Sequence, residues 1–378
     1  MNELHIDKNH WKKYRFDEVC RQVNEATKDP AAEGLDHVIG LEHIEPNNLH
    51  ITHWDTLEKE TTFTRKFKKG QVLFGRRRAY QRKVAYAEFD GICSGDILVF
   101  EAIEKVILPE LLPFLIQSEG FFQKALATSA GSLSPRTKFK ELADYEFLLP
   151  PKAEQKHLAE LLWAADEVVE KEKREVERME ELYNNRIESM FTGEKVAFGE
   201  CANINKSTLS AKTPSDYRFL YIDIASIVSP KHLGPLTEYA FAEAPSRARR
   251  IVKNNDIVLS LVRPYLKAFV QVKNRNEELI ASTGTAVVSA KPDNNTDFLF
   301  HMLFSKAFMT FCENRMNGTN YPAITPADLS DFQVPSYSFY EQKSIANELN
   351  SIDNNIEQLE RQIALSRQIK QELINKMF

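Results

Sequence analysis

The most regular hydrophobic pattern in the chain occurs twice, in stretches that lie 187 residues apart. Residues 154–173 read EQKHLAELLWAADEVVEKEK, and residues 341–360 read EQKSIANELNSIDNNIEQLE. Apolar side chains recur in both at alternating spacings of four and three residues, the 3.5-residue period of a coiled coil. The two seams contain Leu158, Leu162, Ala165, Val169, Glu172, Val176, Met179, Tyr183, Arg186 and Met190, and Ile345, Leu349, Ile352, Ile356, Leu359, Ile363, Ser366, Lys370, Leu373 and Met377.

These stretches predict two long helices that pair with each other, because neither can bury its seam alone. The first would reach a second globular part through the short joint 192–195 (TGEK), and the second would start from that part. Pairing within the chain would therefore be antiparallel, with the globular parts roughly 60 Å apart at most at about 1.5 Å per residue. An amphipathic helix packed on its own globular part is the alternative. The length favours a coiled coil, since ordinary helices average about 11–12 residues.

Shorter apolar runs predict strands in two globular parts that resemble each other. The strands are expected at 72–74, 84–86 and 97–100, and at 257–259, 269–272 and 286–288, with a helix near 109–127 and another near 297–315. GQVLFGRRRAY (70–80) aligns with NDIVLSLVRPY (255–265), so Arg78 matches Arg263 and Tyr80 matches Tyr265. The loops SAGSLSP (129–135) and MNGTNYP (316–322) align Gly131 with Gly318 and Pro135 with Pro322.

The sequence thus predicts an α+β protein with two mixed α/β domains and an antiparallel intramolecular coiled coil, related by a pseudo-two-fold axis. The expected division is a first globular domain, a long helix, a second globular domain and a second long helix, at 1–151, 152–192, 193–337 and 338–378.

Charge is sorted along the chain, although the net charge is only −5. Residues 61–87 carry nine Lys/Arg and no acid, and residues 245–275 carry eight Lys/Arg and one acid, whereas residues 152–191 carry eleven acids and seven bases. Local fields steer association, so two basic domains remain compatible with nucleic acid. The four cysteines are scattered, and there is neither a signal-peptide pattern nor an apolar run of 18 residues, which together favour the cytoplasm.

Two similar basic domains at a fixed spacing suit a two-part site on DNA. Lysine and arginine would hold phosphates, while arginine pairs with guanine and Asn/Gln pair with adenine. The candidate DNA-binding residues of the first domain are Arg76, Arg77, Arg78, Tyr80, Gln81, Arg82, Lys83, Ser132, Ser134, Arg136 and Lys138. Those of the second domain are Arg247, Arg249, Arg250, Arg263, Tyr265, Lys267, Asn317, Thr319, Asn320 and Tyr321. A solvated strand edge or a plain turn is the alternative for any one of them.

The order of domain and helix, together with LLPPKAEQKHLAELLWAADEVV, FQVPSYSFYEQKSIANELNSIDNNI and GQVLFGRRRAY, resembles the specificity subunit of type I restriction–modification enzymes over residues 11–378. The resemblance implies two target recognition domains, each reading one half of an asymmetric bipartite DNA site. It also implies that the helices set the gap and dock two methyltransferase subunits, to which restriction subunits can attach. S-adenosylmethionine, ATP and Mg²⁺ would then belong to those partners. The second domain departs from the pattern, since RRR becomes LVR and only Arg263 is retained.

Sequence signatures of catalysis are missing, so we expect no enzyme activity, cofactor or metal in this chain. No NPPY or DPPY amine-gripping loop, P-loop or HExxH motif occurs, and His50 and His53 lack a third ligand. Pro292-Asp293 and the EQK at 341–343 could mimic a nuclease, but EQK also opens the first helix, where glutamate complements the helix dipole. A coiled-coil scaffold whose basic domains bind acidic partners, or a self-contained nuclease or methyltransferase, are the competing hypotheses.

Overall fold

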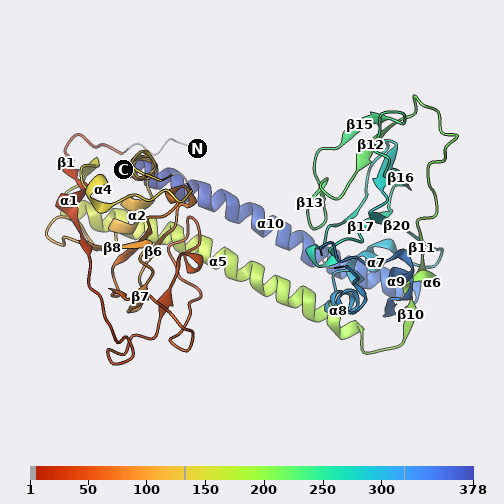
Figure 1. Cartoon of the computed structure of the whole chain (residues 1–378), viewed down its shortest axis with the longest axis horizontal. Coiled ribbons are helices and arrows are strands. Elements are labelled where there is room, and N and C mark those ends of the chain that lie inside the picture. The colour runs from red at the N-terminus through yellow and green to blue at the C-terminus, as the bar shows by residue number, and fades with distance from the viewer. Residues whose placement is uncertain (1–5, 132, 319) are drawn as a thin grey trace. The chain divides into compact units, whose positions relative to one another are not determined.

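The computed structural model describes residues 6–131, 133–318 and 320–378, which form two compact units. Unit 1 comprises residues 1–173 and 361–378, and unit 2 comprises residues 174–360. Each unit contains one globular part and one segment of each of two long helices, α5 (Lys152–Met190) and α10 (Phe339–Met377) (Figure 1). No helix in the described part of the chain is long and apolar enough to span a membrane.

Unit 1 is built on a four-stranded antiparallel sheet with the order β2-β8-β5-β6. A second sheet, β3-β7-β4, contains a parallel pair, and β1 pairs with β9. The strands are β1 (Lys12–Arg15), β2 (Cys20–Val23), β3 (Val38–Ile39), β4 (Arg65–Phe67), β5 (Val72–Gly75), β6 (Val84–Tyr86), β7 (Gly91–Cys93), β8 (Ile97–Ala102) and β9 (Glu146–Leu149). The short helices are α1 (Phe16–Val19), η1 (Leu41–His43), η2 (Ala79–Gln81), α2 (Leu112–Gln117), α3 (Glu119–Ala127) and α4 (Phe139–Leu142).

Unit 2 repeats this topology, with the sheet β11-β20-β17-β18 in place of β2-β8-β5-β6. Its second sheet, β15-β12-β19-β16, has the corresponding parallel pair β12/β19 and is extended by β15, and a hairpin β13-β14 is added. The strands are β10 (Lys195–Ala197), β11 (Ala202–Ile204), β12 (Arg218–Ile222), β13 (Ile227–Ser229), β14 (His232–Leu233), β15 (Thr237–Ala240), β16 (Ala248–Val252), β17 (Ile257–Ser260), β18 (Phe269–Gln271), β19 (Leu279–Ser282), β20 (Thr285–Ala290) and β21 (Gln333–Pro335). The short helices are α6 (Phe198–Cys201), η3 (Pro264–Leu266), α7 (Thr296–Met302), α8 (Lys306–Arg315) and α9 (Pro326–Asp331).

The six strands predicted from apolar runs are confirmed as β5, β6, β8, β17, β18 and β20, with small differences at their ends. The single helix predicted in each globular part was wrong, because a serine divides it into two. The Ser118 hydroxyl accepts a hydrogen bond from the amide of Phe121 and begins α3, and Ser305 caps α8 in the same way through Phe308. A capping serine satisfies the free amides at a new helix start, so the chain can change direction there.

Helices α5 and α10 run antiparallel in both units. In unit 1, Asp166 of α5 contacts Lys370 of α10, and further along α5 the Glu172 carboxylate contacts the earlier Ser366. In unit 2, Glu180 of α5 lines one pocket with Glu360 of α10, whereas the later Arg186 contacts the earlier Glu348. The polar seam positions therefore find partners on the opposite helix, and the predicted antiparallel pairing is confirmed within each unit.

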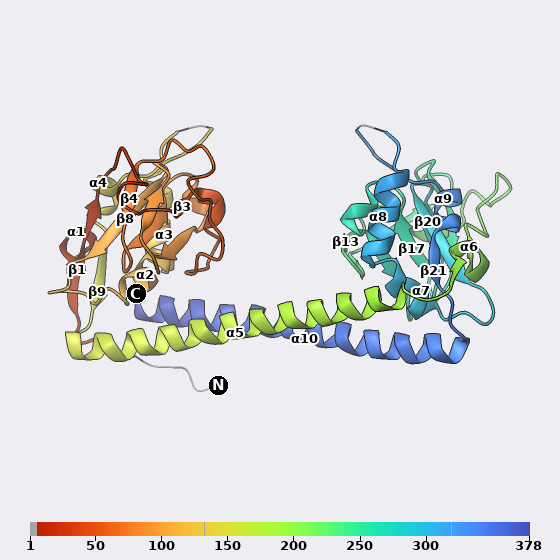
Figure 2. The same ribbon diagram turned by 90° about the horizontal axis from the view of Figure 1, so that it is seen from below.

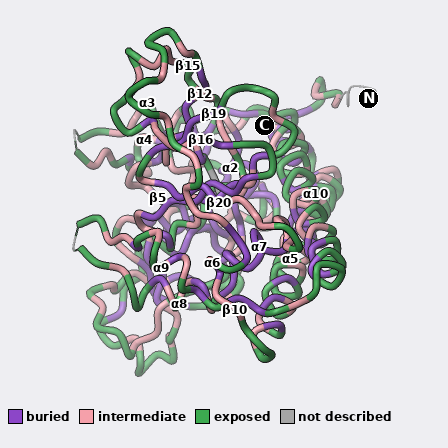
Figure 3. Tube along the Cα trace, turned by 90° about the vertical axis from the view of Figure 1, so that its right-hand side faces the viewer, coloured by how far each residue is buried: buried purple, intermediate pink, exposed green. Residues whose placement is uncertain are grey.

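The buried face of each helix is wider than the predicted seam. Figure 3 shows buried and exposed stretches on both long helices. Leu162, Val169, Leu349 and Ile363 are buried as expected. Additional buried positions flank the seams because, within each unit, the globular part also packs on one side of the helices (Figure 2). These flanking residues are Gln155, Ala159, Asp166, Ile187, Gln342, Ala346 and Ile374.

Candidate nucleic-acid interface

A short cation-bearing turn follows β5 in unit 1. The 3₁₀ turn η2 lies between Arg78 and Arg82, whose φ angles of 54° and 53° place both in the left-handed region. Non-glycine residues are uncommon there, so the surrounding structure must hold them. The backbone amide of Arg78 donates to the carbonyl of Pro135 at 2.8 Å, which fastens the turn to the loop that follows Gly131.

Unit 2 contains the same turn after β17. Here η3 lies between Arg263 and Lys267, with φ angles of 49° and 52°. The amide of Arg263 donates to the carbonyl of Pro322 at 2.7 Å. Both glycine loops also use a positive φ that glycine adopts readily, 118° at Gly131 and 100° at Gly318. The structure thus joins two predicted candidate segments, the basic turn and the glycine loop, in each unit.

Two arginines of the unit 1 interface share one carboxylate. Arg136 binds Asp96 through Nε at 2.7 Å and through a terminal nitrogen at 3.2 Å. Arg77 reaches the same carboxylate at 3.5 Å and donates to the Ser134 hydroxyl at 3.1 Å. The hydrogen bond from Arg136 is the main reason that the pKa of Asp96 lies below its usual value, although burial opposes it.

Three other predicted cations of unit 1 are partly buried, and two of them bind other residues of the unit. Arg76 is partly buried, its Nε has no partner among the described residues, and burial lowers its pKa. Arg82 pairs with Glu119 and lies over the ring of Phe122, at 4.8 Å from the ring centroid. Lys83 donates to the carbonyl of Leu41 at 2.6 Å. These contacts leave Arg82 and Lys83 less available to a ligand than the sequence indicated, whereas Arg76 is desolvated without a partner for its Nε.

The remaining unit 1 candidates lie nearer to solvent. Tyr80, at the centre of η2, is 57% exposed, and Gln81 is half-buried beside it. The Arg78 guanidinium makes no hydrogen bond or ion pair with another residue that the structure describes. Lys138 is exposed, and its backbone amide donates to Glu141 at the start of α4. Ser132 lies outside the described residues.

In unit 2 the arginine of the turn lies against the glycine loop. Arg263 donates to the carbonyl of Asn320 at 3.0 Å, and its guanidinium lies 5.1 Å from the centroid of the Tyr321 ring. Tyr265 corresponds to Tyr80 and is 46% exposed. Asn317 forms a backbone bridge with Ala323 within the loop. Thr319 lies outside the described residues.

The basic cluster Arg247, Arg249 and Arg250 belongs to a different sheet from the Arg263 turn. Arg249 and Arg250 lie on β16 of the second sheet, and Arg247 precedes that strand. Arg249 lies over the ring of Phe241, while the Nε of Arg250 is buried without a partner among the described residues. The carbonyl of Arg247 accepts from the amide of Thr283 at 2.9 Å, beside Gly284, whose carbonyl accepts from the amide of Leu261 just before the turn.

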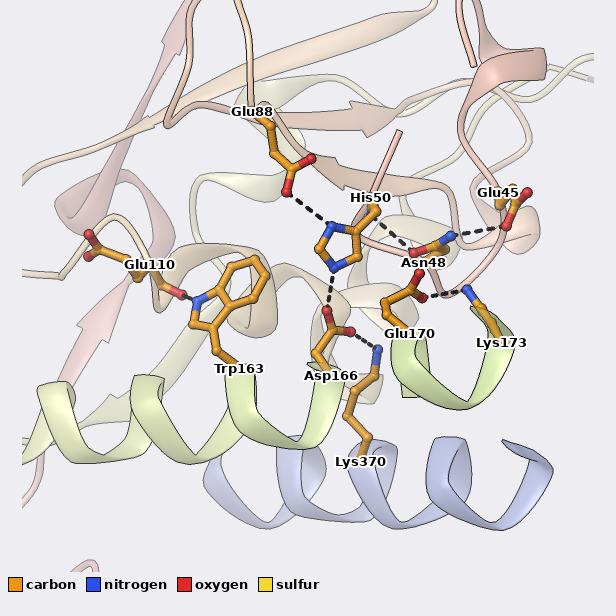
Figure 4. A network of polar contacts seen from close by, with 10 residues as sticks. All are labelled: Glu45, Asn48, His50, Glu88, Glu110, Trp163, Asp166, Glu170, Lys173 and Lys370. Carbon is orange, nitrogen blue, oxygen red and sulfur yellow. Dashed lines mark hydrogen bonds and ion pairs between the residues drawn. The ribbon is translucent and has the colours of Figure 1, made fainter. Parts of the chain in front are cut away.

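Sequence reasoning missed a polar network that ties the globular part of unit 1 to its helices (Figure 4). His50 lies between Glu88 and Asp166, with ring nitrogens 3.1 Å and 2.7 Å from their carboxylates. The hydrogen bond with Asp166 raises the pKa of His50, while burial opposes that shift. Burial raises the pKa of Asp166, but His50 and Lys370 together outweigh it and leave that pKa below its usual value.

The equivalent aspartate of unit 2 binds a lysine instead of a histidine. Asp353 lies at the position of α10 that corresponds to Asp166 in α5, and it pairs with Lys231 from the β13–β14 turn. Both connections come from the segment that follows the parallel strand, β3 in unit 1 and β12 in unit 2. The sequence contained a signal for these connections, since Asp166 and Asp353 occupy the same position in the two repeats.

The EQK segments fasten each helix to its unit through the glutamine rather than the glutamate. Gln155 is buried, accepts from the amide of Leu108 at 2.9 Å, and donates to the carbonyls of Val106 and Pro150. Gln342 repeats this arrangement with the amide of Asn295 at 2.8 Å. These contacts support a structural role for EQK. The buried glutamine fixes each helix to its globular part, in addition to the favourable effect of the glutamate on the helix dipole.

Glu42, His43 and Asp55 form a cluster whose ligand atoms lie within 4.8 Å of one another. The Nδ1 atom of His43 accepts a hydrogen bond from the amide of Gly40 at 2.9 Å, so in neutral His43 the proton is on Nε2, facing Asp55. Lys59 binds Asp55 at 2.7 Å. Backbone and lysine contacts thus engage His43 and Asp55 within the chain.

With this geometry established, comparison with known proteins identifies the family. The sequence matches the type I restriction modification DNA specificity domain twice, over residues 8–181 and 197–371. The chain belongs to this family. The two matches follow the internal repeat found in the sequence and in the fold, with one copy beginning in each globular part.

Individual relatives agree with this assignment. The specificity subunit of the type I restriction enzyme MjaVIII from Methanocaldococcus jannaschii is 24% identical over 298 residues, which cover 71% of this chain and 68% of that protein. The S subunit structure from M. genitalium has a TM-score of 0.58 at 14% identity, covering 99% of this chain and 98% of its own. A structure from work on complex assembly and conformational transition of the type I R-M system has a TM-score of 0.57 at 19% identity, with 97% of both chains covered. At these identities the two structures show the shared fold.

Proposed function

We propose that the chain is the sequence-specific DNA-recognition subunit of a type I restriction–modification enzyme, and that each unit reads one half of an asymmetric bipartite site. One observation carries the proposal. Both units hold an arginine in the left-handed region beside a 3₁₀ turn, hydrogen-bonded to the proline carbonyl of a glycine loop, while the side chains around it differ. A common frame with different side chains suits two half-sites of different sequence.

The chemistry of the turns suits DNA. Arginine presents five donors in a planar fork that matches guanine or phosphate, and the fixed backbone lowers the entropy lost on binding. Tyr80 and Tyr265 add an exposed aromatic ring at the centre of each turn. Binding by such a surface should weaken steeply as salt rises, because phosphate contacts release counterions.

The helices are the proposed docking elements for two methyltransferase subunits, with restriction subunits attaching where they are present. Leu161, Val168, Leu365 and Ile369 are large apolar side chains exposed on the unit 1 segments of α5 and α10, and they would support such contacts. The chain would be non-catalytic and cytoplasmic. S-adenosylmethionine would bind the methyltransferase subunits, and ATP and Mg²⁺ the restriction subunits.

Methylome sequencing of the host with and without this gene tests the proposal. We expect one bipartite motif to lose its methylation in the deletion strain and to regain it on complementation. A scaffold that binds acidic partners would leave every methylated motif in place, and this outcome would overturn the proposed function.

A further inference from the structure

The Arg77, Asp96 and Arg136 side chains form a compact charged triad at the unit 1 interface. Asp96 accepts two hydrogen bonds from Arg136 and one from Arg77, and its carboxylate is mostly shielded by them. Arg77 and Arg136 stay partly exposed, and Ser134 adds a second contact to Arg77. The triad keeps a net charge of about +1, because each arginine remains protonated and Asp96 remains ionised.

Unit 2 has the same backbone at these three positions but none of the charges. The backbone bridge between Arg77 and Arg136 corresponds to the bridge between Val262 and Ala323. The amide of Arg76 donates to the carbonyl of Asp96 at 2.9 Å, as the amide of Leu261 does to Gly284 at 3.2 Å. Arg77, Asp96 and Arg136 are thus replaced together by Val262, Gly284 and Ala323.

This replacement argues against a role in folding. Unit 2 keeps the backbone bridge and the hydrogen bond from Leu261 to Gly284, although the three residues in place of the triad are uncharged. The fold therefore does not need the triad. A charged group that the fold does not require, placed beside the basic turn, points instead to a ligand-facing role.

We infer that the triad determines the base preference of unit 1, with Arg77 and Arg136 reading bases and Asp96 acting as their positioning residue. The inference rests on the proposed DNA-recognition function. Asp96 binds the Nε edge of Arg136 and so fixes the plane of the guanidinium, while the other terminal nitrogen makes a long contact of 3.5 Å with the carbonyl of Ser134. A preorganised guanidinium discriminates guanine better than a mobile one, since less rotamer entropy is lost on contact. A lone carboxylate would repel the DNA backbone, and the two arginines neutralise it.

Three variants of the full chain, each complementing the deletion strain, test the inference by methylome sequencing. Asp96→Asn keeps the size of the side chain and removes the charge that orients the arginines. The triple variant Arg77→Val, Asp96→Gly, Arg136→Ala installs the set that unit 2 already accommodates. Arg21→Ala is the matched control, because Arg21 is an exposed unit 1 arginine paired with Glu101 on the adjacent strand β8.

We expect both triad variants to lower base discrimination by roughly fivefold or more at one or two positions of a single half-site, as loss of a bidentate arginine contact does. The other half-site should keep its sequence, which also shows that the subunit folded and assembled, and the control should retain the wild-type motif. An unchanged motif, equal loss in both half-sites, or complete loss of methylation would overturn the inference. Absence of any bipartite motif in the wild type would instead overturn the proposed function.

Discussion

Lys370 of α10 donates a hydrogen bond from Nζ to Oδ1 of Asp166 on α5 at 2.7 Å, and the two side chains are only 5% and 2% exposed. Asp166 also binds His50 from the globular part. One carboxylate therefore links three segments of unit 1 that are far apart in the sequence. A buried charge with two partners is stable only while both remain in place.

Lys370→Met should lower the free energy of unfolding of unit 1 by about 3 kcal/mol, because it leaves the buried Asp166 carboxylate with His50 as its remaining cation. Denaturant unfolding followed by amide hydrogen exchange in the unit 1 segments would measure the loss. Lys376→Met is the control, since Lys376 is exposed near the end of the same helix and should change stability by less than about 1 kcal/mol. Equal effects of the two variants would show that the buried pair contributes little.

The stability of unit 1 should decrease as pH rises above about 6.5, the usual pKa of histidine. The pKa of His50 is raised in the folded chain, so its protonated form contributes stability below the usual value of 6.5, and this contribution is lost as pH rises through the raised pKa. The loss should approach about 1.4 kcal/mol per pH unit at most. The His50→Gln variant should lack this pH-dependent loss of stability when it and the wild type are both measured from about pH 6 to about pH 9. Parallel pH profiles for the two proteins would contradict the assignment.

Unit 2 should respond to pH in the opposite sense through His301. The Nε2 atom of His301 donates to the amide oxygen of Asn350 at 2.9 Å, so Nδ1 of the neutral ring accepts from the Tyr183 hydroxyl at 2.8 Å. Burial lowers the pKa of His301 to about 4. The unfolded chain therefore binds the proton first, and stability should fall as pH is lowered from about 6.5 towards 4. Amide hydrogen exchange in α7 at a series of pH values would measure this loss of stability. A His301→Gln variant that loses stability as steeply as the wild type over this range would refute the role of His301.

The sequence predicted the long helices well because each has a 3.5-residue period, which few other structures produce. It could not show why Glu172 and Lys370 interrupt the seams. Their partners lie on the opposite helix, and only the antiparallel register brings Glu172 to Ser366 and Lys370 to Asp166. The division at Ser118 was within reach, since serine is a preferred helix cap, but the apolar run around it favoured a single helix.

The candidate interface was predictable where the repeat marked it. Arg78 and Arg263 align in sequence and occupy the same left-handed position beside their turns. The roles of Arg76 and Lys83 could not be read from composition, because burial and a carbonyl contact engage them. Asp96 was missed because a single acid carries no pattern, and its meaning depends on two arginines from separate loops.

Selection of binding sites from random duplex DNA tests the central claim most directly, using the chain in complex with the methyltransferase subunits proposed as its partners. We predict a bipartite site for the wild type. Arg78→Ala should lose about 1–3 kcal/mol of base preference in one half-site only, and Arg263→Ala should lose a similar amount in the other half-site only. If each variant weakens both half-sites equally, or if the selected site is one contiguous block, the two units do not read separate halves of the DNA.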